Sequence, residues 1–261
     1  MLLRSFIGVV VVGVLGTPAL SLQAQSTKTA APQPQWLMVS IVKVNPGAAA
    51  EYVDLQTKEV MPAQKKGDSL GRQAWSSGVI GPARQFVYVS PISSLAQFDK
   101  PSPMVTALGQ EGAAALGAKV AKLAEPMQTM IVRSRPDLSY NPNPAVTSPL
   151  AIVTIVEVVP GKRVDFEAFI KKDVLGAMQQ AKAKSYSVLE VVYGDSTNAF
   201  ITAVGYDTYE AIGNGHPFQI ALGEDGARKL DAKVAGIISR VERFISRHRP
   251  DLSWSPQAGT K

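Results

Sequence analysis

The chain carries the same pentapeptide twice: ArgProAspLeuSer stands at residues 135–139 and again at residues 249–253. A second motif is repeated in the same way, because ValAsnProGly at 44–47 is followed by ValValProGly at 158–161. Both pairs are 114 residues apart (249 − 135 and 158 − 44). A constant offset of this size predicts an ungapped internal duplication, which constrains the fold more than any single motif does.

Each copy predicts the element order strand, helix, strand, strand, helix, strand. The first strands, 37–44 and 151–158, are β-branched and almost continuously apolar, as is typical of strands covered on both faces. Pro-Gly then opens a helix, in which Pro62 and its counterpart Gly176 predict a kink. The remaining strands are expected at 72–79, 85–90, 187–193 and 199–204, followed in each copy by a last strand that ends at the pentapeptide. The second helices are expected to run through Leu116, Val120 and Leu123, and through Leu230, Val234 and Ile237.

This element order resembles the dimeric α+β barrel superfamily, which includes NIPSNAP-type, antibiotic-biosynthesis-monooxygenase-type, EthD-type and chlorite-dismutase-type domains. In that superfamily a ferredoxin-like unit pairs its sheet with the sheet of a second unit to close a barrel. The resemblance implies an α+β fold with two tandem βαββαβ units, 37–142 and 150–256, that form such a barrel within one chain. The physical reason is that a sheet with helices on one face leaves its other face bare, and pairing two such faces buries both.

The N-terminus predicts a secretory signal peptide at residues 1–24. Arg4 supplies the positive charge, residues 6–15 the apolar core, and Ala24 the residue before cleavage. The alternative is an uncleaved N-terminal anchor, although the apolar core is short for a span, which needs about 20 residues. Linkers are expected at 25–36 and 143–149, and a short tail at 257–261.

The composition narrows the compartment and the partners. The chain has no cysteine, hence no disulfide and no thiolate metal site, and with a signal peptide this favours a bacterial periplasm or exterior. The net charge of +6 comes without any run of Lys and Arg, so no nucleic-acid partner is expected. No later segment is apolar enough for a membrane span, so no membrane contact is expected after cleavage.

Two histidines, His216 and His248, are the only imidazoles, which excludes a three-histidine metal site, and we predict no metal. His216 precedes a helix in a Gly- and Pro-flanked loop and is the candidate catalytic residue, as a proton shuttle or a haem ligand. The plainer alternative, which we prefer, is a solvated or helix-capping residue. A role for His248 is less favoured, and no cofactor is predicted, with haem as the alternative. Neither histidine lies in a motif that matches the haem-binding histidine of the chlorite-dismutase-type domains.

Two arginine pairs, Arg133 with Arg135 and Arg247 with Arg249, recur two residues apart and therefore on one strand face. A guanidinium can hold a ligand carboxylate or phosphate. The alternative is a structural tie to Asp137 or Asp251, which we prefer because both copies keep ArgProAsp together.

Five aromatic residues are the candidate ligand-binding residues. The two copies do not share these aromatic residues, since Trp75 matches Leu189 and Tyr88 matches Thr202. This asymmetry suits a pseudo-dimer in which one copy keeps a pocket, and equally suits drift in a core, which is the safer interpretation for each residue alone. The five are Trp75, Tyr88, Tyr186, Tyr193 and Tyr206.

The sequence therefore favours an exported barrel pseudo-dimer that binds a small organic molecule between sheet and helices. The alternatives are a cofactor-independent or haem-dependent oxygenase, and a structural or interaction module. Further oligomerisation stays open, and no motif decides whether the protein is an enzyme.

Overall fold

The computed structural model describes residues 33–256. The predicted signal peptide, residues 25–32 of the first linker and the tail at 257–261 lie outside the described residues. Within the described range, no helix combines the length and the apolar character that crossing a membrane requires.

One closed antiparallel barrel contains the strands, in the order β1-β3-β2-β8-β5-β7-β6-β4. The strands are β1 Trp36–Val44, β2 Gln73–Ser77, β3 Gln85–Ile92, β4 Ala124–Ser134, β5 Leu150–Val158, β6 Tyr186–Tyr193, β7 Ala199–Tyr206 and β8 Ile238–His248. We call β1–β4 with their helices the first half and β5–β8 with theirs the second half. The strand order is β4-β1-β3-β2 in the first half and β8-β5-β7-β6 in the second, and the pairs β4–β6 and β2–β8 join the halves.

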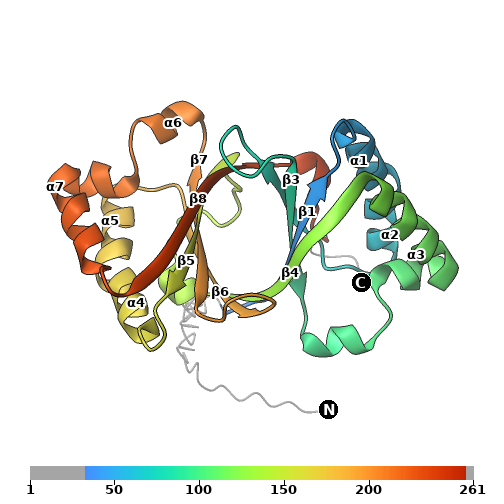
Figure 1. The fold of residues 1–261 in the computed structure, drawn as a ribbon, viewed down its shortest axis with the longest axis horizontal. Helices are drawn as coiled ribbons and strands as arrows, with labels where there is room; N and C mark the ends of the chain where they lie inside the picture. Colours follow the sequence, from blue (N-terminus) through green and yellow to red (C-terminus); the bar gives the residue numbers. More distant parts are fainter. Residues whose placement is uncertain (1–32, 257–261) are drawn as a thin grey trace, which may run out of the picture. The chain divides into compact units, whose positions relative to one another are not determined.

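Helices cover the outside of the barrel on two opposite sides (Figure 1). The first half has α1 Ala49–Leu55, α2 Met61–Lys66 and α3 Pro103–Leu123; the second has α4 Arg163–Phe169, α5 Leu175–Gln180, α6 Tyr209–Gly213 and α7 Pro217–Lys233. Most elements of the second half begin 114 residues after their counterparts in the first half. We call two residues that are 114 positions apart equivalent.

The predicted kinks take the form of π-helical turns. These are η1 Gln56–Val60, just before α2, and η4 Ile170–Val174, just before α5. Pro62 has no N–H to donate to the preceding turn, which is consistent with a wider turn there. The prediction that the last helix runs through Val234 and Ile237 is wrong. Val234 caps α7, and Gly236 at φ +75° turns the chain toward β8.

Strand alternation separates an inner barrel face from an outer, helix-covered face. The inner face is filled by apolar side chains around Val39, Met130, Val132, Val191 and Ala199, as expected for a barrel of this strand number. On the outside, α1 and α2 pack on the first half, in a cluster that we call the first core. Its buried members are Val44, Tyr52, Met61, Ala74, Phe86, Tyr88, Ala124 and Leu252. The second core is the corresponding cluster under α4 and α5, and includes Leu138, Phe166, Ile170, Met178, Tyr186 and Phe200.

The two ArgProAspLeuSer segments are arms that cross between the halves. After β4, residues Pro136–Leu138 form a 3-10 turn that places Leu138 in the second core, fully buried. After β8, Pro250–Leu252 form the equivalent turn and place Leu252, also fully buried, in the first core. Each half therefore supplies a fully buried leucine to the core of the other.

The serine of each arm fixes this crossing. Ser139 Oγ donates to the Arg135 carbonyl (2.7 Å) and accepts from the Val188 backbone N–H (3.0 Å). Ser253 Oγ makes the equivalent bonds, to the Arg249 carbonyl (2.7 Å) and from the Ala74 backbone N–H (2.8 Å). The repeated pentapeptide is thus a backbone tie between the halves.

Candidate functional site

The first core has polar side chains at positions where the second core has apolar or aromatic ones. Burying a polar group is costly unless it is hydrogen-bonded, so such an exchange in a core needs a reason. The first-core residues are Tyr52, Gln56, Gln64 and Arg72, and the equivalent second-core residues are Phe166, Ile170, Met178 and Tyr186.

Three elements carry the polar cluster. Tyr52 in α1 and Gln56, four residues later in η1, lie on the same helical face. Arg72 stands two residues before Ala74 of β2 and therefore faces the first core with it. Tyr88 comes from β3, two residues after Phe86 and on the same face. Periodicity in helix and strand thus brings all of these side chains into one layer.

The geometry centres on Arg72, which is only 5% exposed. Its guanidinium carbon lies 4.4 Å from the centroid of the Tyr88 ring, and its Nε donates to the Leu252 carbonyl (2.9 Å). The hydroxyls of Tyr52 and Tyr88 are hydrogen-bonded to each other at 2.9 Å. Both phenols lie close enough to favour its charge, and none of the ion pairs among residues 33–256 includes Arg72. Arg72 is therefore a buried cation without a counter-ion among the described residues.

Several polar atoms of this region are buried without a hydrogen-bond partner among the described residues. The two donors are Arg72 Nη2 and Trp254 Nε1, and the two acceptors are Gln56 Oε1 and Gln64 Oε1. Native cores leave few such atoms, and each one needs an explanation. A bound molecule that offers both acceptor and donor atoms would satisfy them.

Burial raises the pKa of the Tyr52 hydroxyl, and that of Tyr88, above the ordinary value for a phenol. Both are therefore neutral at physiological pH and able to donate. Burial lowers the pKa of Arg72, but a guanidinium starts so high that it stays charged.

The C-terminal arm closes the cluster. Trp254 and Arg72 exchange two backbone hydrogen bonds, of 2.8 and 2.9 Å, and Trp254 packs against the first core. Two surface hollows lie elsewhere, one of about 430 Å³ between α2 and α3 and one of about 440 Å³ at a barrel end near Lys43 and Arg84. Neither is lined by Arg72.

The five aromatic residues predicted from the sequence do not converge. Tyr88 belongs to the polar cluster, whereas Trp75 lies on the inner face, its ring 5.1 Å from that of His248. Tyr186 and Tyr206 are buried in the second core, and Tyr193 is 53% exposed at the end of β6.

His216 is the N-cap of α7. Its Nδ1 accepts from the Phe218 backbone N–H (3.3 Å), and Gln219 completes a capping box. The equivalent residue, Ser102, also caps its helix, α3, where its Oγ accepts from the Val105 backbone N–H (3.3 Å). Burial, with a smaller effect of Arg243, lowers the pKa of His216 to about 4. The ring is thus a neutral cap at physiological pH.

His248 lies on the inner face, where its Nε2 meets Gln73 Oε1 (2.9 Å) and Ser253 Oγ (3.1 Å). Each histidine therefore uses one ring nitrogen in contacts within the protein: Nδ1 of His216 and Nε2 of His248. Within residues 33–256, no group of His, Asp and Glu is arranged to hold a metal ion.

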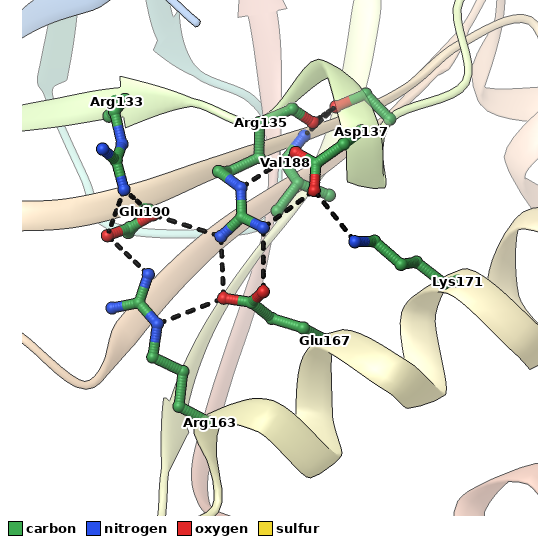
Figure 2. A network of polar contacts seen from close by, with 9 residues as sticks. Arg133, Arg135, Asp137, Arg163, Glu167, Lys171, Val188 and Glu190 are labelled. Carbon is green, nitrogen blue, oxygen red and sulfur yellow. Dashed lines mark hydrogen bonds and ion pairs between the residues drawn. The ribbon is translucent and has the colours of Figure 1, made fainter.

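Arg133 and Arg135 enter an ion-pair network at the β4–β6 junction (Figure 2). Arg135 is bidentate to Asp137 (2.8 and 2.9 Å) and also binds Glu167 (2.7 and 2.8 Å). The Arg135 guanidinium lowers the pKa of Asp137 to about 2. These contacts saturate Arg135 with carboxylates of the protein itself, which leaves it little capacity for a ligand.

The second arginine pair has fewer partners. Arg249 is bidentate to Asp251 (2.6 and 2.9 Å) and lies over Phe86, while Arg247 is exposed beside the Tyr209 ring. The two arginine pairs are therefore not alike in their surroundings, although their sequences are.

Sequence reasoning missed Tyr52, Gln56, Gln64 and Arg72 as site residues. A signal was present, because a comparison at the 114-residue offset places each of them opposite an apolar or aromatic residue. What the sequence does not reveal is that Arg72, at a strand end, is covered by an arm from the far end of the chain.

No known protein family matches the sequence, and no curated protein matches it either. Solved structures are similar to it. One is a proposed monooxygenase from Fusobacterium nucleatum, 12% identical, with TM-score 0.55 over 87% of this chain and 96% of that one. Another is an anthrone oxidase-like protein, 9% identical, with TM-score 0.57 over 87% and 96%. A third is a chlorite dismutase mutant from Candidatus Nitrospira defluvii, 11% identical, with TM-score 0.52 over 83% and 92%.

These similarities establish the fold. The chain has a mixed α+β fold, an eight-stranded antiparallel barrel covered by helices, which is consistent with the dimeric α+β barrels. At such low sequence identity, these similarities assign no role to any residue of the site.

Proposed function

We propose that the protein binds a small organic molecule in the first core, between α1–α2 and the sheet. The observation that carries this proposal is the polarity difference between the cores: Tyr52, Gln56 and Gln64 stand where the second core has Phe166, Ile170 and Met178. Buried amides with unpaired oxygens are stabilised when a bound molecule supplies donors.

The test is an exchange of core residues. The triple variant Tyr52→Phe, Gln56→Ile, Gln64→Met gives the first core the residues of the second and leaves Arg72 in place. Native mass spectrometry of the wild type is expected to detect a retained organic molecule, which the triple variant loses while it stays folded. The matched control is Thr202→Val in the second core, which should retain the molecule. The proposal fails if the wild type retains no molecule and none of a panel of planar organic molecules raises its melting temperature.

A second candidate function is an oxygenase-type reaction on the same molecule. It is favoured by the fold similarity to proposed monooxygenases and to an anthrone oxidase-like protein. Oxygen uptake by the purified protein with the retained molecule tests it, and absence of uptake leaves a binding protein. A structural or interaction module is the remaining alternative, which predicts no bound molecule at all.

We also propose that the protein is exported and that it consists of two ferredoxin-like units fused by duplication. This proposal is supported by the 114-residue offset and by the apolar N-terminal segment with Arg4. N-terminal sequencing of protein from a periplasmic fraction should begin at Gln25; a start at Met1 would favour the uncleaved anchor.

A further inference from the structure

Arg72 distinguishes the polar cluster from an ordinary network of neutral groups. A buried charge is costly unless it is paired, and native proteins almost always pair it. Asp251, the acidic residue of the covering arm, is taken by Arg249 at 2.6 Å. The cation therefore lacks a protein counter-ion, and its Nη2 lacks any hydrogen-bond acceptor among the described residues.

Several donors around Arg72 lack an acceptor among the described residues, beside the two glutamine oxygens that lack a donor. In the Tyr52–Tyr88 pair one hydroxyl donates to the other, so the second hydroxyl keeps a hydrogen without an acceptor. Trp254 Nε1 is a further unpaired donor. A positive charge with surplus donors, set among aromatic rings, is complementary to an oxyanion attached to an apolar body.

We infer that the molecule bound in the first core carries a carboxylate, and that Arg72 is the residue that binds it. This inference rests on the proposed function and adds the chemical class of the ligand. A carboxylate offers the charge that neutralises the guanidinium and two oxygens that match its planar fork. The aromatic rings of Tyr88, Phe86 and Tyr52 form the apolar surroundings.

If Arg72 serves to bind a ligand, substituting it should abolish ligand binding without lowering the stability of the fold. Without ligand, Arg72 is a desolvated charge, and replacing it by an apolar residue of similar length should not weaken the fold. We therefore expect Arg72→Met to melt at the wild-type temperature or above it. An arginine whose purpose is structural would give the opposite result.

The experiment compares benzoate with benzamide, which differ mainly in the charge of one group. Melting temperatures are measured for the wild type and for Arg72→Met, with sodium sulfate as a third probe at matched ionic strength. Benzoate is expected to stabilise the wild type at concentrations at least about tenfold lower than benzamide, and to have no effect on Arg72→Met. Arg72→Lys, which keeps the charge without the fork, should respond to benzoate only weakly.

A second measurement does not depend on a folded variant. The ¹⁵Nε resonance of Arg72 in the wild type should shift with benzoate and not with benzamide. Equal responses to both probes would overturn the carboxylate assignment while leaving a binding protein. A benzoate response retained in Arg72→Met would also overturn it, and equal stabilisation by sulfate would reassign the site to inorganic anions. No response to either probe, with a neutral retained molecule in the mass spectrum, rejects the inference alone; with no retained molecule, both proposals fall.

Discussion

Arg133 of β4 lies opposite Glu190 of β6 and is ion-paired with it at 3.0 Å, whereas its equivalent, Arg247 of β8, lies opposite Ser76 of β2. The two junctions that close the barrel are therefore built differently. Glu190 has a side chain only 7% exposed and also binds Arg135 (3.2 Å) and Arg163 (2.5 Å). The β4–β6 junction depends on this carboxylate, and the β2–β8 junction depends on neutral contacts.

Glu190→Gln should therefore destabilise the protein. The substitution leaves three arginines with less negative charge in a partly buried network, and we expect a loss of about 2–4 kcal/mol in the free energy of unfolding. Chemical denaturation measures it. The control is Asp54→Asn, which breaks the exposed pair with Lys58 and should cost less than about 1 kcal/mol. Equal effects of the two substitutions would contradict the structural role of Glu190.

The crossing arms predict that Leu138→Ala and Leu252→Ala destabilise the protein to a similar extent. Each leucine is fully buried in the core of the other half, so each truncation should cost about 3 kcal/mol. Thermal and urea unfolding measure the effect, and Leu95→Ala, at an exposed position, is the control. Arms that contribute nothing to the cores would leave both variants at the wild-type stability.

His216 predicts a pH dependence with a defined sign. The unfolded chain protonates this histidine below its ordinary pKa near 6.5, but the folded protein does so only below about 4. Between these values the unfolded state binds more protons, so stability falls as the pH falls from about 6.5 to 4. His216→Asn keeps a helix cap without a titrating group and should flatten this part of the profile, by on the order of 1 kcal/mol because the ring is partly solvated.

The same profile has an internal control. His248, whose pKa is also lowered by burial, still titrates in the variant, and Asp137 still loses its ion pair at lower pH. The variant should therefore retain acid unfolding below pH 4. A wild-type profile that stays level between pH 6.5 and 4 would reject the burial of His216.

Gly194, at the β4–β6 junction, occupies a position where we expect a larger residue to strain the backbone. It has φ +91°, and a Cβ added there would lie 2.4 Å from the Thr129 carbonyl oxygen. Gly194→Ala should cost more than about 2 kcal/mol. Gly117, in α3 with open space around it, is the matched control, and Gly117→Ala should stabilise by about 0.5–1 kcal/mol. Unfolding of both variants in urea decides between these expectations.

The sequence by itself determined the element order and the approximate strand positions, because these depend on local patterns. Almost continuous apolar, β-branched runs place β1 and β5, and helix capping, the preferred interpretation of His216 from the sequence, is what the structure shows. Fold class followed from the same patterns, since two half-covered sheets have one obvious way to bury their bare faces.

The tertiary structure alone decided which residues meet. Arg72 and Leu252 are 180 positions apart, and their contact exists only because an arm crosses from one half to the other. Strand periodicity assigns a side chain to a face but does not say what covers that face. Burial is a property of the closed barrel. Only the folded chain shows that Arg72 is buried without an ion-pair partner in the range 33–256, whereas Arg135 is neutralised by Asp137 and Glu167.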